Sequence, residues 1–470
     1  MKRNSYRNIF YFLLPFLGTL FLLWYVKNAT CDVVYSDYVR LVNSYLPDVW
    51  DPEKFFVPDV LTRLPINYLA RIINVELFGF SITFERVLGV VSVGLAALVF
   101  ARYCVSRSVG AVWFCLLMAV MFSLNQWEML TNGSGWSHFF AVAGFFYNQV
   151  VLDRVWNGNP KKYDDIRLLL LPWLLILGTA GPYGGSYGAV MLLAYVFCFL
   201  YGRKRKDDSQ KEWGRRYVFC FLNTLLPLLL YLLSNSFAVE SHAGATGRSL
   251  TVILSENPSF FPRFILKSLA GMVIGGEELL QWIQGGALPN SACYLLGGFV
   301  AAAYLLALWL HVRYKLYEKH LLPLLLLIGG GGNHLLIFLS RYIFEQEDYA
   351  LSSRYALQFK VGILGILLTF AFVWGKTAIN RFLKAAIGLF CLAILLGNGY
   401  TTYREIKKAP YREENFEKMA RLAPEIPGMS DEALLEQKQE LEDLYEYRKG
   451  IYDLRQAFRI LEENNLNIFR

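Results

Sequence analysis

The chain has 470 residues, of which 55% are hydrophobic and only 18% are charged. Soluble domains average about 25% charged residues, so this composition excludes an ordinary soluble protein and indicates that lipid surrounds much of the chain. The net charge is +8, but no basic groove with interleaved stacking aromatics is evident, and nucleic acid is not an expected partner.

The apolar runs predict an all-α, polytopic membrane protein. The first run, residues 9–26, lacks a small-x-small cleavage site, so we expect a retained span rather than a signal peptide. A window of about 20 residues places the other spans and brings the total to about 11. These further spans lie near 84–103, 109–126, 136–153, 167–180, 188–201, 217–236, 292–312, 321–342, 356–375 and 384–400.

Positive charges in the connections predict the orientation. Segment 203–216 carries seven Lys or Arg, and further basic clusters lie at 154–162, 313–319 and 376–384. By parity these connections share one side with the N-terminus, which the positive-inside rule makes cytoplasmic. The C-terminus is then expected outside.

Three long segments are expected on the outer side. In the first, 27–83, apolar residues between 34 and 45 recur at helical spacing, which predicts a short helix lying in the membrane interface. Segments 64–80 and 264–283 are too polar for confident spans, and whether they cross is left open. The composition changes after residue 400, which predicts a transmembrane catalytic-type domain at 1–400 and a soluble helical C-terminal extension at 401–470.

No motif of a soluble enzyme is present. Nucleophile-elbow, phosphate-loop, zinc-protease and dinucleotide patterns are missing, and the seven cysteines form no metal-binding or disulfide framework. Gly329 to Gly332 lie within an apolar run, where close packing between spans is the favoured interpretation, and His334 beside them is expected to be a satisfied histidine of the bundle. Polar residues gather instead in two clusters, 32–40 and 345–355, which the topology puts on one face.

This arrangement resembles the C-type membrane glycosyltransferases (GT-C fold), and within them an uncharacterised bacterial branch. Three short strings carry the resemblance: Tyr35-Ser36-Asp37-Tyr38, Gln126-Trp127-Glu128-Met129 and Ser352-Ser353-Arg354-Tyr355. The resemblance implies transfer of a sugar from a polyprenyl-phosphate donor to a cell-envelope glycan, lipid or protein, outside a bacterial plasma membrane. Many members of the family show two adjacent acids where this chain has Ser36-Asp37, which weakens the case for a metal in that loop.

Such a reaction needs a carboxylate to take a proton from the acceptor hydroxyl and cations at the leaving phosphate. Asp37 is the candidate base, and Arg354, helped by Arg341 or Lys360, is the candidate for the phosphate. The metal ligands stay unknown, and a divalent cation is left open as a cofactor. Further candidates for substrate binding are Tyr38, Arg40, Glu128, His138 and Tyr355.

Two other functions stay open. One is a transporter or flippase for a lipid-linked sugar or another amphiphile, although no internal repeat is found and polar residues concentrate outside the spans. The other is a non-catalytic partner that positions another enzyme through its tail.

Overall fold

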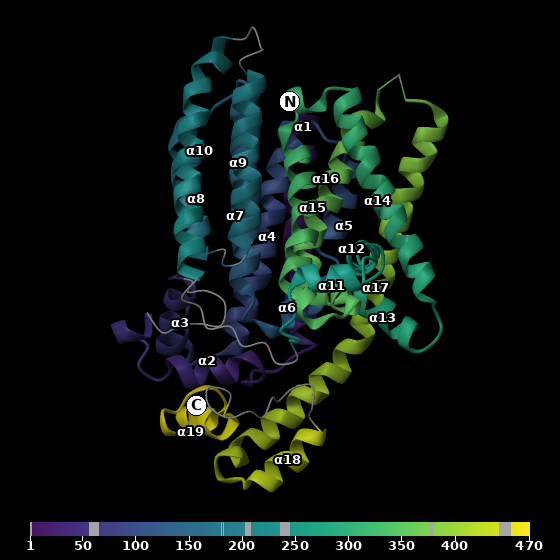
Figure 1. Ribbon diagram of the computed structural model, residues 1–470. Coiled ribbons are helices and arrows are strands. Elements are labelled where there is room, and N and C mark those ends of the chain that lie inside the picture. The colour runs from purple at the N-terminus through teal and green to yellow at the C-terminus, as the bar shows by residue number, and fades with distance from the viewer. Residues whose placement is uncertain are drawn as a thin grey trace.

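The computed structural model describes residues 2–55, 65–179, 181, 183–202, 208–235, 245–376, 379–440 and 453–470. Within these ranges the chain forms helices and connecting segments, and no strand occurs. The long helices lie side by side as a bundle, with the N-terminus at one end and the C-terminus beyond the other (Figure 1). We call the end nearer the C-terminus, drawn at the bottom of Figure 1, the lower end.

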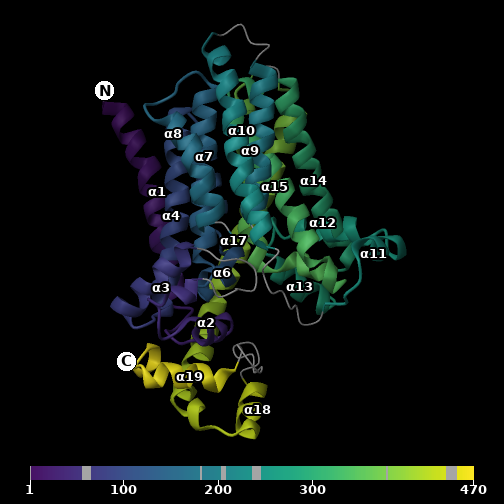
Figure 2. The same ribbon diagram turned by 60° about the vertical axis from the view of Figure 1, so that its left-hand side comes forward.

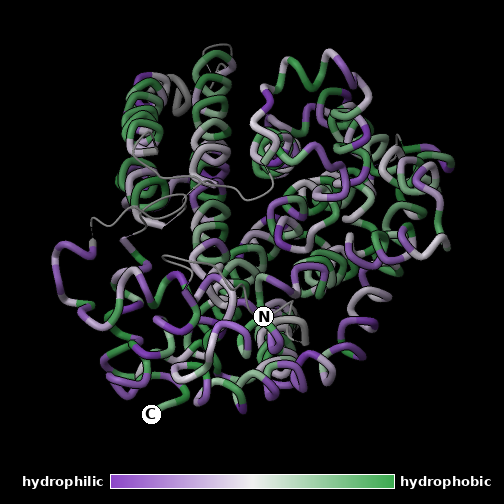
Figure 3. The backbone as a smooth tube through the Cα atoms, turned by 60° about the horizontal axis from the view of Figure 1, so that its bottom comes forward, coloured by the Kyte–Doolittle hydropathy of each residue, from purple (hydrophilic) through white to green (hydrophobic). Residues whose placement is uncertain are grey.

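Nine helical segments in the described part are long and apolar enough to cross a membrane. In the absence of water a helix satisfies its own backbone hydrogen bonds, which is why apolar runs of this length fold as helices. Hydrophobic residues accordingly predominate along the long helices (Figure 3). The prediction of a multi-pass membrane protein is confirmed at this level. The helices are α1 (Lys2–Lys27), α4 (Ile82–Ser106), α5 (Ala111–Met121) continued by η2 (Leu124–Gln126) and α6 (Trp127–Asn132), α9 (Tyr183–Gly202), α10 (Asp208–Asn235), α14 (Asn290–Arg313), α15 (Leu321–Arg341), α16 (Ala356–Trp374) and α17 (Arg381–Leu422).

Two further helices lie beside these: α7 (Trp136–Trp156) and α8 (Asp164–Trp173). α7 carries Asn148 and Gln149 near its middle, which lowers its apolar character. α8 contains Pro172 and continues as a π-helix, η3 (Leu174–Thr179). A proline has no amide hydrogen to donate to the backbone hydrogen bonds of a helix interior. The π-helical turn that follows Pro172 keeps the chain helical beyond this break. Length and composition therefore support nine spans among the described residues, whereas the sequence predicted about 11.

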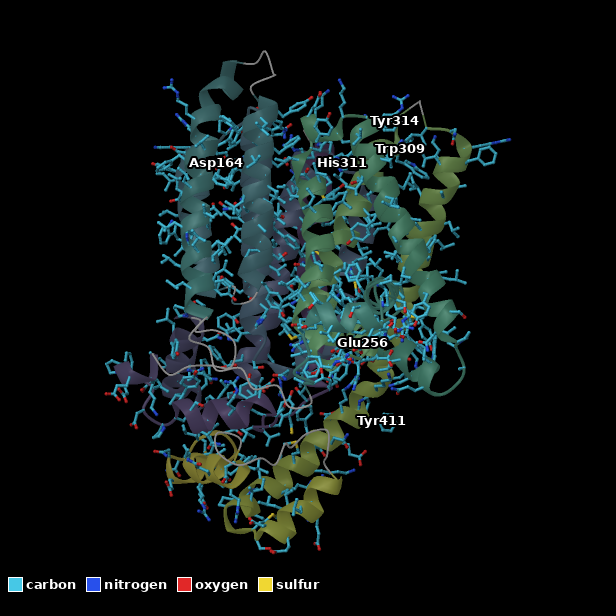
Figure 4. All side chains as sticks on the ribbon, in the orientation of Figure 1. Asp164, Glu256, Trp309, His311, Tyr314 and Tyr411 are labelled. Atoms are coloured by element: carbon cyan, nitrogen blue, oxygen red, sulfur yellow. The ribbon has the colours of Figure 1, made fainter. Side chains whose placement is uncertain are left out.

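Short connections join the helices at the upper end. One contains η4 (Leu316–Glu318), and another precedes α8, where Asp164 pairs with Arg154 and Arg167. Figure 4 shows Asp164 and Tyr314 toward this end and Glu256 and Tyr411 toward the other. Residues 203–207, which include the basic run Arg203 to Lys206, lie outside the described residues.

Longer segments gather at the lower end. Segment 64–80, where a crossing was left open, contains the 14-residue α3, and 264–283 is divided between the 11-residue α12 and the 9-residue α13. A bilayer core about 30 Å thick needs about 20 helical residues, so these helices are too short to cross it. The elements at this end are α2 (Asp37–Tyr45), η1 (Pro52–Phe55), α3 (Pro65–Phe78), α11 (Leu250–Glu256), α12 (Phe260–Ala270), α13 (Gly276–Gln284), η5 (Tyr342–Phe344), η6 (Glu347–Leu351) and η7 (Ser353–Tyr355).

The glycine-rich run packs α15 closely against α16, as predicted. A methyl group on Gly330 would lie 2.3 Å from the Cα of Gly362, so only glycine permits this approach. His334, one turn further along, is buried, and its Nδ1 lies 2.7 Å from the hydroxyl of Ser268. It is a packed bundle histidine, as expected, but it is satisfied only in part, because its Nε2 has no hydrogen-bond partner among the described residues.

The C-terminal region folds against segment 27–83. α17 has 42 residues, so it runs about 63 Å and carries the chain past residue 400 without a break. The tail turns back at the lower end (Figure 2), where Phe458 and Leu461 share a core with Val39 and Val42 of α2. The expected helical tail is therefore present and covers α2; its described elements are η8 (Ala423–Gly428), α18 (Asp431–Glu440), α19 (Leu454–Glu463) and η10 (Asn467–Phe469).

Candidate functional site

Segments far apart in the sequence meet at the lower end. α6 contacts η7, and Tyr35, two residues before α2, donates a hydrogen bond from its hydroxyl to the Thr131 carbonyl of α6 at 3.2 Å. The polar clusters at 32–40 and 345–355 therefore lie at the same end, as the sequence indicated.

An ion pair joins α6 to η7. The carboxylate of Glu128 accepts hydrogen bonds from Arg354 Nε and, at 3.0 Å, from the Ser353 hydroxyl. The two partners of the ion pair are 226 residues apart in sequence. The Arg354 side chain is 48% exposed, so it keeps a face open to a ligand while Glu128 holds it in place.

Asp37 is the first residue of α2 and is half-buried. No described residue hydrogen-bonds to its carboxylate, yet its charge acts on both Arg354 and Tyr35. The preceding Ser36 has φ 48°, which is unusual for a residue other than glycine. The structure thus brings the candidate base and the candidate phosphate binder into electrostatic reach of each other.

A second arginine lies in the same neighbourhood. Arg341, the last residue of α15, donates a hydrogen bond from Nε to the Tyr355 hydroxyl at 2.5 Å. Tyr355 is also within electrostatic reach of Arg354 and Glu128. Tyr183, at the start of α9, interacts with Tyr355 and both arginines. Two guanidinium groups and two phenols therefore cluster beside Glu128.

Lys360 lies deeper, in the second turn of α16, and is 4% exposed. Its ammonium donates a hydrogen bond to the Ser123 carbonyl at 3.0 Å, and none of the described carboxylates forms a salt bridge with it. A cation buried in a membrane domain is costly, so such a residue is a functional candidate. It lines a cavity with Val93, Ala96, Met121, Gln126, Phe139, Val142, Phe146, Leu357 and Leu364.

A second cavity lies between α7, α9, α15 and α16. Ser186 donates a hydrogen bond to the Asn333 side chain at 2.6 Å, whereas the side-chain oxygens of Gln149 and Gln358 have no hydrogen-bond partner in the described part. This is a neutral, hydrogen-bonding lining within apolar helices. The lining residues are Val142, Phe145, Phe146, Gln149, Tyr183, Ser186, Tyr187, Val190, Gly329, Asn333, Gln358 and Val361.

The remaining predicted substrate-binding residues have different surroundings. Tyr38 is fully buried and its hydroxyl donates to Glu85 at 2.7 Å, so it fastens α2 to α4. Arg40 is half-buried on α2. His138 packs edge-on against Tyr183, with ring centroids 4.5 Å apart, which puts it beside the arginine cluster.

Two buried groups next to the ion pair have shifted pKa values. Burial raises the pKa of Tyr35 to about 12, so its hydroxyl stays neutral at physiological pH. Burial also raises the pKa of Glu277 above its ordinary value. Glu277 accepts a hydrogen bond from the Trp127 indole at 2.9 Å, and this contact supports the residue that precedes Glu128.

Metal ligation was left open by the sequence. Across the described ranges, no group of three or more His, Cys, Asp or Glu side chains is arranged to hold a metal ion. Glu128 is paired with Arg354, and the charge of Asp37 also acts on Arg354.

Several residues of the cluster were not predicted as site residues. Tyr183 stands among the glycines 181, 184, 185 and 188, which permit a close approach of the backbone, and it is the first residue of α9. Glu277 and Gln358 gave no local signal, because the first lies in an ordinary amphipathic helix and the second within an apolar run.

Comparison of the chain with protein-family models, with curated proteins and with solved structures finds no match in any of the three.

Proposed function

We propose that this protein is a membrane glycosyltransferase that moves a sugar from a polyprenyl-phosphate-linked donor to a cell-envelope acceptor at the extracytoplasmic face. The observation that carries the proposal is the position of the Asp37 carboxylate. It has no hydrogen bond among the described residues and acts electrostatically on Arg354, the exposed cation of a cluster at one end of the bundle.

The proposed step needs one base and one anion-binding group. Asp37 takes the proton of the acceptor hydroxyl as the hydroxyl oxygen attacks the anomeric carbon. The new bond joins that oxygen to the sugar, and the bond between the anomeric carbon and the phosphate oxygen breaks. The polyprenyl phosphate leaves with the bonding electron pair, and cations offset the negative charge that develops on it.

Arg354 and Arg341 are the proposed contacts of the phosphate. Guanidinium groups give planar, paired hydrogen bonds to phosphate oxygens, which suits a group that must be held in line with the attacking hydroxyl. Lys360 lies six residues beyond Arg354, deeper in the bundle, and is the third basic side chain proposed to assist at the phosphate. Glu128 fixes Arg354, and His138 and Tyr355 border the same region.

The proposal includes a topology. α7 and α8 with η3 are taken as two further crossings, which brings the number of spans to about 11. The N-terminus is then cytoplasmic and the lower end, with the tail, is extracytoplasmic in a bacterial plasma membrane. Cysteine labels at positions 245 and 436 should react from outside intact cells, and one at position 315 should not.

The test uses purified protein in nanodiscs supplied with radiolabelled polyprenyl-phosphate sugars and extracted envelope acceptors. Formation of a labelled glycosidic product supports the proposal. The proposal would be wrong if no donor gave a product and the donor instead moved across proteoliposome membranes. That result would favour transport as the function.

Transport of a lipid-linked sugar is the second candidate because of the cavity between α7, α9, α15 and α16. Its neutral polar side chains, Gln149, Ser186 and Asn333 among them, lie within apolar helices, where transporters hold their substrates. The place of Asp37 and the arginine cluster at one end of the bundle favours chemistry over translocation, since transporters hold their substrates near the middle of the membrane.

A further inference from the structure

α3 (Pro65–Phe78) exposes large apolar side chains although its buried side, which includes Ile72 and Val75, is also partly apolar, and this differs from a helix at a water-exposed surface. Arg71 and Asn74 are turned inward and are 7% and 0% exposed. Leu69, Ile73 and Leu77 are turned outward and are 56%, 45% and 66% exposed. In water, an amphipathic helix buries its apolar stripe and exposes its polar one.

The inward Arg71 and Asn74 side chains are both held by contacts within the protein. The Arg71 guanidinium lies 3.9 Å from the ring centroid of Tyr45, the last residue of α2. Asn74 exchanges two hydrogen bonds with the backbone of Ser81, at 2.8 and 2.9 Å. These contacts fix the rotation of α3, so its leucines cannot turn inward without breaking them.

The outward face is a continuous apolar stripe. Leu69, Ile73 and Leu77 are spaced four residues apart and so lie on one side of the helix. At the edge of the stripe, the exposed indole of Trp50 donates a hydrogen bond to Glu76 at 2.7 Å. A tryptophan with its ring exposed and its N–H satisfied is typical of the boundary between lipid and water.

The stripe is continuous with the lipid-facing surface of the bundle. α3 contacts η3, the lower part of the α8 helix. Ile166, Leu170 and Leu174 are exposed along α8 and η3, at the same four-residue spacing. Figures 1 and 2 both show α3 beside the lower end of the bundle, above α19.

We propose that α3 lies in the membrane surface, with Leu69, Ile73 and Leu77 inserted among the lipid chains of the adjacent leaflet and Arg71 and Asn74 facing the protein. At 14 residues, about 21 Å, the helix is too short to span the bilayer and long enough to rest in one leaflet. Because Arg71 holds Tyr45, the inserted helix also sets the depth of α2, which begins at Asp37. The inference does not depend on the proposed chemistry.

The test is the collision accessibility of nitroxide spin labels on the full-length protein in vesicles of phosphatidylethanolamine and phosphatidylglycerol. Labels are placed at Ile73→Cys and Leu77→Cys after Cys115→Ser removes the exposed native thiol. Leu95→Cys on the lipid-facing side of α4 and Glu432→Cys on the exposed face of α18 are the matched references.

The proposal predicts that labels at 73 and 77 collide with oxygen far more than with a water-soluble nickel chelate, as at 95. The reverse preference, as at 432, would mean that α3 is in water and would overturn it. Low collision with both reagents would mean that another protein or a second copy covers the stripe, and would overturn it equally.

Discussion

The guanidinium carbon of Arg412 lies 3.4 Å from the ring centroid of Trp127, the residue that precedes Glu128. Arg412 belongs to the part of α17 beyond residue 400, and it also pairs with the buried carboxylate of Glu405. The indole of Trp127 in turn donates to Glu277. The extension of α17 thus holds α6 in place, and with it the Glu128 partner of Arg354.

Arg412→Ala should therefore lower the thermal unfolding midpoint in detergent. It removes the cation–π contact and one cation from buried Glu405, at a cost of about 3 kcal/mol. Arg421→Ala is the control, because Arg421 is exposed and its one ion pair among the described residues is with Glu417, one turn away, so its loss should cost less than about 0.5 kcal/mol. Equal shifts for the two variants would contradict the buried role of Arg412.

Gly362→Ala should destabilise the bundle strongly. A methyl group at this position would lie 1.4 Å from the Tyr304 hydroxyl oxygen of α14, so the Tyr304 ring or α14 must shift away from α16, at a cost of about 1–3 kcal/mol. Gly388→Ala on α17 meets no atom within 4 Å and should be neutral or slightly stabilising, since alanine favours a helix. Thermal unfolding of both variants checks the contrast; a harmless Gly362→Ala would mean that Tyr304 of α14 packs less closely against α16 than described.

Asn467→Ala should loosen α2 without affecting the rest of the bundle. Its side-chain oxygen accepts from Val34 N at 3.1 Å, and its amide donates to the Phe80 carbonyl at 3.0 Å. Losing both should cost about 1–3 kcal/mol and speed amide hydrogen exchange in residues 37–45. Asn464→Ala, whose side chain bonds only within α19, should leave that exchange unchanged; fast exchange in both variants would point to general unfolding instead.

These contacts show what could be predicted from the sequence and what could not. Apolar runs report local solvent preference, so they located helices such as α10 and α15 near their true positions. The contact partners of individual side chains could not be predicted in this way, because they depend on how distant segments of the chain meet in the fold. No local pattern indicates that Asn467 bonds Val34, or that Glu128 pairs with Arg354. Tyr38 was predicted to bind substrate because it adjoins Asp37, yet its ring points inward to Glu85.

Acidification should weaken the contact between α12 and η6. Burial alone would raise the pKa of Glu347, but hydrogen bonds from Lys267 and Tyr294 and the charges of Lys267 and Arg263 hold it below its ordinary value of 4.5. A depressed folded pKa gives stability that is complete above the unfolded pKa and is lost as the pH falls through the folded pKa.

The measurement is the unfolding midpoint of the parent protein and Glu347→Gln over a pH series. The parent should be the more stable at neutral pH, and the gap should close below about pH 4.5. Glu277→Gln should behave oppositely, because burial raises the pKa of Glu277 and its ionised form costs stability as the pH rises. A gap that is independent of pH for Glu347→Gln would contradict the ion-pair account.

Substitutions of Arg354 and Asp37 should have different effects, the first on donor binding and the second on the rate of sugar transfer. Arg354→Ala removes charge-assisted contacts to phosphate and should weaken donor binding by about tenfold or more. Asp37→Asn keeps the shape of the side chain but cannot accept the proton, so donor binding should survive. Binding of a polyprenyl-phosphate sugar to each variant in nanodiscs checks this division.

The most direct measurement is the rate of sugar transfer by Asp37→Asn at saturating donor, beside the parent and Asp48→Asn, an exposed aspartate of the same segment. The proposed mechanism predicts a fall of about 10²–10⁴-fold for Asp37→Asn with donor binding retained, and a parent-like rate for Asp48→Asn. Transfer by Asp37→Asn at the parent rate would contradict the assignment of Asp37 as the base.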